Sequence, residues 1–131
     1  MAEKIEMNGM TYMTEFERGL LPQIAECPAA FLRAQNPSEE FMRAAVFMNT
    51  YFIHFIENQS HMVRMLAAKL DYTTEPMIHG ITPEIRVALN KKNTRGIMGA
   101  DLSRREIEEY ANAMNVMKFG FAAEHLYPRK R

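Results

Sequence analysis

The sequence predicts an all-α protein: a single-domain helical bundle of about four to five helices around a long central helix at about 37–70. Two observations carry this prediction. Apolar residues recur at alternating spacings of three and four along the chain, and no stretch alternates apolar and polar residues as a half-buried strand does. A chain of 131 residues that is 47% apolar and 24% charged fits one compact domain over 1–131. We therefore expect neither a second domain nor an internal repeat.

The first 35 residues predict two short helices. Thr14 and Glu17 have the spacing of a capping box, in which each side chain caps the backbone of the other. Gly19, Pro22 and Pro28 then divide the region into short pieces.

The central helix has the clearest start and the longest apolar pattern. Asn36 suits the N-cap, Pro37 the first turn, and Glu39 the position that reaches back to the cap. No glycine or proline follows until Pro76. Over this length the 3.5-residue spacing predicts a seam for an oligomer or a partner, formed by Phe41, Ala45, Met48, Phe52, Phe55, Met62 and Leu66.

The length of that helix indicates one of two outcomes. From 37 to 70 it would span ~51 Å, whereas a domain of this size is only ~36 Å across. Either the helix breaks near Asn58, Gln59 and Ser60, which are poor helix formers, or its overhang packs against a second copy. The second outcome predicts a homo-oligomer.

Two more helices are expected after Pro76. Thr82 and Pro83 open one that ends near Lys92, and Ser103 with Glu106 forms a capping box for another that runs to about Tyr127. Apolar residues of the last helix form a stripe that we expect to pack on the seam.

Composition and charge restrict the location and the partners. The lone Cys27 cannot pair within the chain, which fits a reducing, cytoplasmic compartment, and no apolar run approaches the ~20 residues that cross a bilayer. The net charge is zero, but residues 1–82 carry 10 acidic and 6 basic side chains and residues 83–131 the reverse. Such an asymmetry concerns partners and self-association rather than fold.

Three ionisable residues on the central helix are weak candidates for a metal site. His54, Glu57 and His61 would share one side of a continuous helix and have suitable metal-ligand chemistry. A solvated polar stripe opposite the seam explains them better, because a helical metal site needs further ligands on partner helices. We therefore expect no metal and no cofactor.

The segment 91–105 is basic and is the candidate for anion or nucleic-acid binding. It contains Lys91, Lys92, Arg95, Arg104 and Arg105 against the single carboxylate of Asp101. Free N–H groups at the start of the helix that begins there would attract phosphate. A solvated connector between two helices explains the same composition without a ligand.

The sequence favours surfaces over reactive groups. It has no nucleophile-and-base pattern, phosphate loop, dinucleotide fingerprint or paired zinc-ligand motif, so we do not expect an enzyme. Its 12 methionines suit an adaptable apolar contact surface. We expect a non-enzymatic helical interaction protein that self-associates and binds a protein partner as adaptor, inhibitor or regulator. The alternatives are nucleic-acid binding through 91–105 and a bundle that binds a metal or small molecule.

Overall fold

The computed structural model describes residues 5–7 and 10–119, and within them the all-α prediction is confirmed. The α-helices are α1 (Glu15–Glu26), α2 (Glu39–Met48), α3 (His61–Leu70), α4 (Pro83–Asn90) and α5 (Arg104–Phe119). Short 3-10 helices lie between them: η1 (Pro28–Arg33), η2 (Thr50–Phe55), η3 (Tyr72–Met77) and η4 (Gly96–Gly99). No described helix is both long and apolar enough to cross a bilayer.

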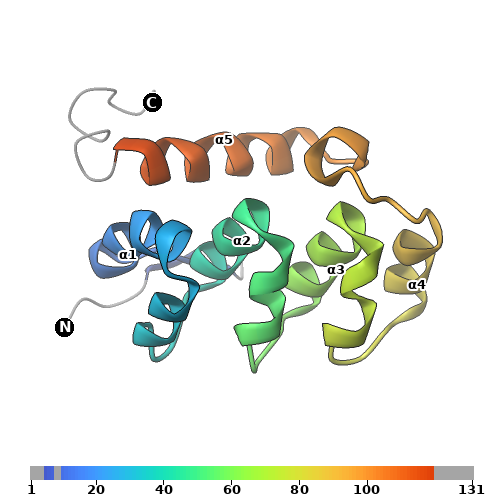
Figure 1. Cartoon of the computed structure of the whole chain (residues 1–131), viewed down its shortest axis with the longest axis horizontal. Coiled ribbons are helices and arrows are strands. Elements are labelled where there is room, and N and C mark those ends of the chain that lie inside the picture. The colour runs from blue at the N-terminus through green and yellow to red at the C-terminus, as the bar shows by residue number, and fades with distance from the viewer. Residues whose placement is uncertain (1–4, 8–9, 120–131) are drawn as a thin grey trace.

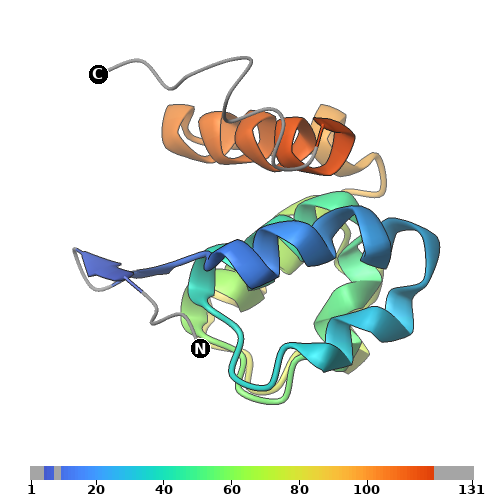
Figure 2. The ribbon, with the colours of Figure 1, turned by 90° about the vertical axis from the view of Figure 1, so that its left-hand side faces the viewer.

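The helices are arranged in rows rather than around one central helix. Figure 1 shows α1 to α4 side by side, with the first three 3-10 helices in a second row beside them. Each α-helix and the 3-10 helix that follows it form one turn of a coil, and successive turns overlie one another when viewed along the row (Figure 2). Helix α5 lies across the row as a separate layer over α1, α2 and α3 (Figure 1).

The chain contains an internal repeat with a period of 22 residues, so our expectation of no repeat was wrong. The side chains that cap the starts of α2, α3 and α4 are Ser38, Ser60 and Thr82, each 22 residues after the last. Asn49 and Asp71, also 22 apart, end α2 and α3 and cap the 3-10 helices that follow. Such units stack on their neighbours and bury a core that none buries alone.

A hydrogen bond between neighbouring units is itself repeated. The Glu17 carboxylate accepts hydrogen bonds from the Ser38 backbone N–H and hydroxyl, at 2.8 and 2.7 Å. One unit later the Glu39 carboxylate accepts from the Ser60 hydroxyl at 2.8 Å. The same serine hydroxyls accept from Phe41 and Val63 N–H and so start the helices. One polar pair therefore both caps a helix and joins it to the unit before.

The segment 37–70 is not one continuous helix: it breaks near Asn58, Gln59 and Ser60, which is one of the two outcomes expected from the sequence, and also at Asn49, where no break was predicted. Helix α2 ends at Met48, and the backbone of Asn49 is extended, with φ −158° and ψ 114°. The Asn49 side chain accepts a hydrogen bond from the Tyr51 N–H, which offers the backbone an alternative to the helix. The chain breaks again before Ser60, which caps α3. It therefore bends back on itself, and no overhanging rod exists to require a second copy.

The other helix boundaries were predicted to within a few residues. The capping boxes at Thr14 and Ser103 are present, but Ser38 rather than Asn36 caps α2. The predicted end of the last helix near Tyr127 lies outside the described residues. We missed the antiparallel hairpin of β1 (Ile5–Met7) and β2 (Met10–Tyr12), whose three-residue strands are too short to show an alternating pattern.

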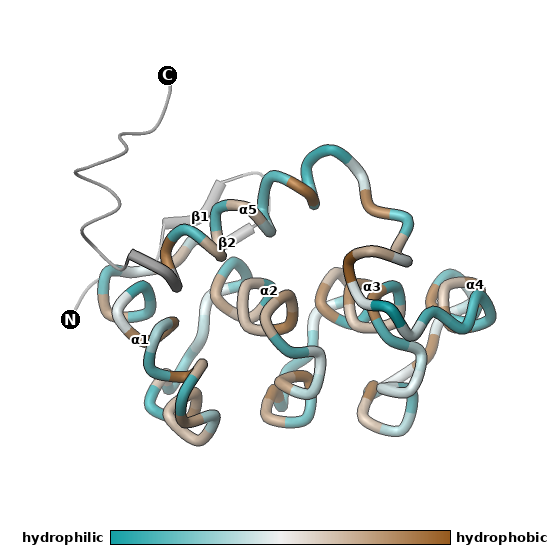
Figure 3. The backbone as a smooth tube through the Cα atoms, turned by 45° about the horizontal axis from the view of Figure 1, so that its top comes forward, coloured by the Kyte–Doolittle hydropathy of each residue, from teal (hydrophilic) through white to brown (hydrophobic). Residues whose placement is uncertain are grey.

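Aromatic side chains fill the space between the first two units. The Phe31 ring of η1 stacks on Phe41 of α2, with ring centroids 5.2 Å apart, and lies 5.8 Å from the Phe52 ring of η2. Hydrophobic residues recur in every turn of the row, whereas hydrophilic residues are frequent along α5 and the segment before it (Figure 3). The main core therefore lies within the row.

Candidate interaction surface

The residues of the predicted seam do not form one outward face. Phe41, Ala45, Phe52 and Leu66 are buried in the core of this single chain. Met48 and Phe55 are half-buried against that core, and Met62 is exposed. The seam prediction was wrong because it assumed one helix; the bends at Asn49 and before Ser60 distribute these side chains over α2, η2 and α3.

The three weak metal candidates are also separated by the bends. His54 lies in η2, Glu57 in the loop that follows, and His61 begins α3; all three are exposed. Within the described part of the chain no three His, Cys, Asp or Glu side chains are grouped so that they could hold a metal ion. Their predicted common side depended on the continuous helix.

The five cations of the basic segment lie on exposed positions around the end of the row. Lys91 faces Asp101, with Nζ 3.6 Å from the carboxylate. Arg104 and Arg105 face Glu108 and Glu109 one turn later on α5, at 3.9 and 3.5 Å. Lys92 and Arg95 have no carboxylate partner among the described residues. Part of the positive charge of 91–105 is therefore neutralised within the chain.

A large apolar hollow lies over the row of 3-10 helices. This groove has a volume of about 630 Å³ and is lined by Pro28, Asn49, Tyr51, Phe52, His54, Phe55 and Met77. Three successive units contribute to it, since Pro28 begins η1 and Met77 ends η3. No single helix of the sequence would bring these residues together; the stacking of the units does.

The local structure of η2 explains why an aromatic ring is left in solvent. The Asn49 cap sets the first turn of η2, in which Phe52 and Ile53 point into the core. Tyr51, one residue before them, points outward and is 56% exposed. The half-buried Phe55 closes the groove from below, with its ring centroid 5.9 Å from Phe52 and 6.3 Å from Phe31. The floor is therefore firmly packed, and Tyr51 stands free at its edge.

Leu32 is a further exposed apolar side chain on the row of 3-10 helices. It occupies the place in η1 that His54 and Pro76 occupy in the next two units, and its side chain is 63% exposed. Met98, 22 residues after Pro76, is 86% exposed, but its helix η4 lies on the α5 side of the row and contacts α3 (Figure 1). Met98 is therefore not part of the surface that η1 to η3 form.

Three carboxylates lie close in sequence to the groove. Glu26, Glu57 and Glu75 each lie two residues along the chain from a lining residue, whereas no lysine or arginine lies that close in sequence to any of the seven. Glu26 and Glu57 are exposed. Glu75 forms an ion pair with Arg86 of α4 at 2.9 Å. Glu26 and Glu57 are therefore exposed carboxylates near the groove in sequence, whereas the charge of Glu75 is paired.

A second cavity of about 270 Å³ lies between the row and α5. It is lined in part by Phe47 and Met48 of α2 and by Tyr110 and Met114 of α5, and it shares Pro28, Asn49 and Phe52 with the groove. The two hollows are therefore neighbours on one side of the row.

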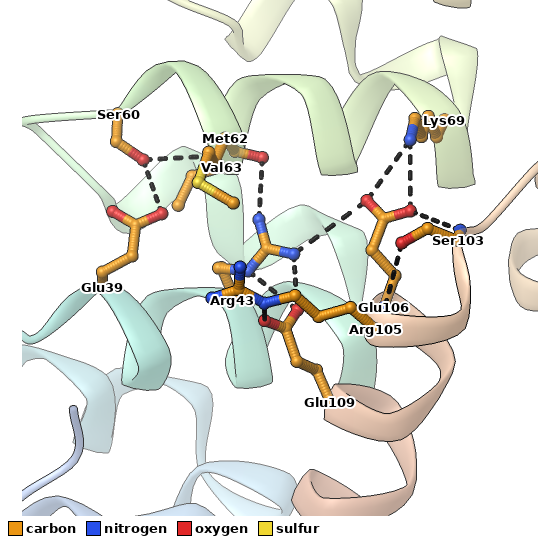
Figure 4. Close-up of polar contacts among 10 residues, drawn as sticks. All are labelled: Glu39, Arg43, Ser60, Met62, Val63, Lys69, Ser103, Arg105, Glu106 and Glu109. Atoms are coloured by element: carbon orange, nitrogen blue, oxygen red, sulfur yellow. Dashed lines mark hydrogen bonds and ion pairs between the residues drawn. The ribbon is translucent and has the colours of Figure 1, made fainter. Parts of the chain in front are cut away.

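A buried charge network holds α5 on the row (Figure 4). Arg43 of α2 is only 2% exposed; its guanidinium forms an ion pair with Glu109 at 2.5 Å and lies 4.0 Å from Glu106. Lys69 of α3 also contacts Glu106, at 3.2 Å. Burial opposes ionisation of Glu106, but the Ser103 N–H that donates to it and the cations of Lys69 and Arg43 outweigh burial and lower its pKa. These charges pair with one another, so the network is structural.

Comparison of the chain with protein-family models, with curated proteins and with solved structures found no match.

Proposed function

We propose that this is a non-enzymatic interaction protein that binds a protein partner, as adaptor, inhibitor or regulator, through the groove over the 3-10 helices. The observation that carries the proposal is the apolar lining of that groove, with Tyr51 more than half exposed at its edge. Exposed apolar surface that the fold itself does not need is typical of an interaction site.

The composition of the groove suits a protein partner. Tyrosine is enriched among the residues that contribute most to binding, because it buries a large apolar surface and keeps one hydrogen-bonding group. The groove belongs to consecutive units, and repeat proteins commonly bind through the extended surface that their units build. A rigid floor formed by Phe52 and Phe55 would require little ordering when a partner binds.

The other functions expected from the sequence receive less support. Self-association through the seam has lost its basis, because most of the seam is core. The case for nucleic-acid binding is weaker, because carboxylates lie opposite Lys91, Arg104 and Arg105 and offset part of their charge. A second copy and a nucleic acid remain as outcomes of the experiment.

The experiment compares two exposed apolar residues in different places. Wild type, Tyr51→Glu and Ile107→Glu are used as baits in an extract of the native cells, with and without nuclease. Ile107 is a matched control, since it is 54% exposed against 56% for Tyr51 but lies on α5 outside the groove. Circular dichroism first establishes that both variants are folded.

The expected result is a protein, other than the bait, retained by wild type and Ile107→Glu after nuclease and lost with Tyr51→Glu. Identical sets of retained proteins on all three baits would overturn the assignment of the binding site to the groove. Recovery of only the bait itself would indicate a homo-oligomer, and loss of all material with nuclease would indicate nucleic acid.

A further inference from the structure

We infer that the partner binds as an extended peptide segment across Asn49, which donates a hydrogen bond to a backbone carbonyl of that segment while two of its apolar side chains enter the hollows on either side. This inference rests on the proposed function and names how the partner binds. It is carried by the place of Asn49 between the hollows and by an amide N–H group that the fold leaves unused.

Asn49 lies where three hollows meet. It lines the groove, the cavity of about 270 Å³ between the row and α5, and a further hollow of about 230 Å³ that shares Met48 and Ile97 with that cavity. Among the described residues, Asn49 alone lines all three. The groove is lined mainly by η1 to η3 and the cavity mainly by α1, α2 and α5. The groove therefore extends from Asn49 toward the 3-10 helices, and the cavity extends from it toward α5.

The cap that Asn49 forms fixes the direction of its amide group. Its Oδ1 accepts a hydrogen bond from the Tyr51 N–H at 3.0 Å. Nδ2 is the other end of the same planar amide, so it faces away from that bond. The residue is exposed, and Nδ2 donates no hydrogen bond within the part of the chain that the structure describes. A donor with a set direction is therefore open to a ligand.

The equivalent places in the other units do not offer this donor. Asp71 has a carboxylate, which accepts hydrogen bonds from Thr73 and has no N–H to donate. Nδ2 of Asn93 already donates to three backbone carbonyls. Cys27, in the first unit, has no amide side chain. The unused donor thus belongs to the middle unit, whose 3-10 helix contributes most of the groove.

An extended peptide supplies what this arrangement lacks. Its backbone carbonyls are strong acceptors that the segment itself does not use, whereas a helix bonds its own carbonyls internally. Successive side chains of an extended chain point to opposite sides. Two adjacent apolar residues can therefore enter the groove and the cavity, while the carbonyl between them accepts from Asn49.

The substitution Asn49→Asp separates binding from folding. Aspartate keeps the oxygen that caps the Tyr51 N–H, as Asp71 does for the Thr73 N–H one unit later. It also replaces the N–H donor with an acceptor, which repels a carbonyl oxygen. The control is Asn58→Asp, which makes the same change in charge at an exposed asparagine that lines none of the three hollows. Thermal denaturation first establishes that both variants are folded.

The probes are peptides from a random 12-residue library displayed on phage and selected on the full-length protein. Selected sequences are synthesised with a fluorescent label, and their affinity is measured by anisotropy. The expected peptides contain two adjacent large apolar residues, and alanine in place of either weakens binding. Tyr51→Glu in the groove and Met114→Ala in the cavity should each weaken binding as well.

The variants at the two asparagines should differ clearly. Asn49→Asp loses a hydrogen bond and adds a repulsion, so it should weaken binding about tenfold. Asn58→Asp should change it less than about twofold.

The failures of the two proposals are distinguishable. Peptides that depend on Tyr51 but bind Asn49→Asp as tightly as Asn58→Asp, or that are indifferent to Met114→Ala, would overturn the extended-segment inference and leave the proposed function intact. Peptides whose binding is indifferent to Tyr51→Glu, or a selection that yields no binder, would overturn both.

Discussion

Arg43 on α2 and Glu109 on α5 are 66 residues apart in sequence, yet Arg43 donates two hydrogen bonds to Glu109 Oε1, from Nη2 at 2.5 Å and from Nε at 3.1 Å. A third donor, Nη1, reaches the Met62 carbonyl of α3 at 3.3 Å. One buried guanidinium therefore joins three elements. Because α5 has little buried apolar surface of its own, with Ala113 and Val116 as its buried apolar residues among those described, this cation is central to its docking.

Replacement of Arg43 should release α5 before it unfolds the row. Arg43→Met removes the cation and leaves the largely buried Glu109 carboxylate without it, which costs about 3 kcal/mol in the free energy of unfolding. Urea denaturation measures the loss, and hydrogen exchange should show the greatest loss of protection in α5.

The control is Arg104→Met on the same helix. The Arg104 side chain is 94% exposed and faces Glu108 at 3.9 Å, so its loss should change stability by no more than about 0.5 kcal/mol. An Arg43 variant as stable as the Arg104 variant would show that apolar contacts alone hold α5.

The lowered pKa of Glu106 makes the same contact sensitive to acid. A carboxylate whose pKa is lower in the folded state stabilises the fold at pH values above its pKa in the unfolded chain, about 4.3. That contribution decreases as the pH falls through the lower, folded pKa. Urea denaturation between pH 7 and pH 3 should show wild type more stable than Glu106→Gln at pH 7, with the difference shrinking below about pH 4.3.

If the ionised form of Glu106 stabilises the α5 contact, the difference in stability between wild type and Glu106→Gln should begin to shrink only below about pH 4.3. If the gap between wild type and Glu106→Gln were the same at pH 3 as at pH 7, the ionised form of Glu106 would not be what stabilises the α5 contact.

Local features of the fold could be predicted from the sequence because they depend on a few adjacent residues. The capping boxes at Thr14 and Ser103 and the start of α4 after Thr82 were correct. The break near Ser60 was one of two outcomes left open and the break at Asn49 was not predicted, because spacing of apolar residues by three and four is satisfied equally by a long helix and by short helices joined by 3-10 turns. The signal that separates them was present: a hydroxyl cap every 22 residues and an Asn or Asp 11 residues after each cap at Asn49 and Asp71.

The groove could not be predicted in the same way. Its residues come from three units, and their proximity depends on how the units stack rather than on spacing along one helix. Aromatic residues 51, 52 and 55 look alike in sequence, but the cap at Asn49 turns Phe52 inward and Tyr51 outward. Once the repeat is known, the exposed places in each unit can be compared, and Leu32 of η1 then stands out as an exposed apolar side chain.

Asn93 occupies the place of Asn49 and Asp71 in the last unit but makes more contacts. Its Nδ2 donates to the Lys69, Leu70 and Gly96 carbonyls at 2.8–3.0 Å, and its Oδ1 accepts from the Arg95 N–H. Asn93→Ala should therefore cost about 2–3 kcal/mol because several partners are lost. Asn49→Ala, which loses the single cap to the Tyr51 N–H, should cost about 1 kcal/mol.

A charge substitution at the same place tests the direction of these bonds. Asn93→Asp puts a carboxylate where three carbonyl oxygens accept, so it should destabilise at neutral pH. Asp71→Asn keeps an oxygen for the Thr73 N–H and hydroxyl and should be nearly neutral. Thermal denaturation of the two variants at pH 7 separates them, and equal losses would contradict the role assigned to the Asn93 amide.

The caps of the three units should differ in strength, although they occupy equivalent places. The Ser38 hydroxyl caps Phe41 N–H and donates to the buried Glu17; the Ser60 hydroxyl makes the same pair of bonds in a less buried setting. The Thr82 hydroxyl accepts from Ile85 N–H, and among the described residues it has no hydrogen bond to a preceding carboxylate.

Alanine at Thr82 removes a cap alone, which costs about 1 kcal/mol in the free energy of unfolding. Alanine at Ser38 also removes the hydroxyl from a buried carboxylate, which raises the loss to about 2–3 kcal/mol. Urea denaturation should therefore show losses in the free energy of unfolding in the order Ser38 > Ser60 > Thr82. Equal losses at the three positions would mean that the contact between units adds nothing to the cap.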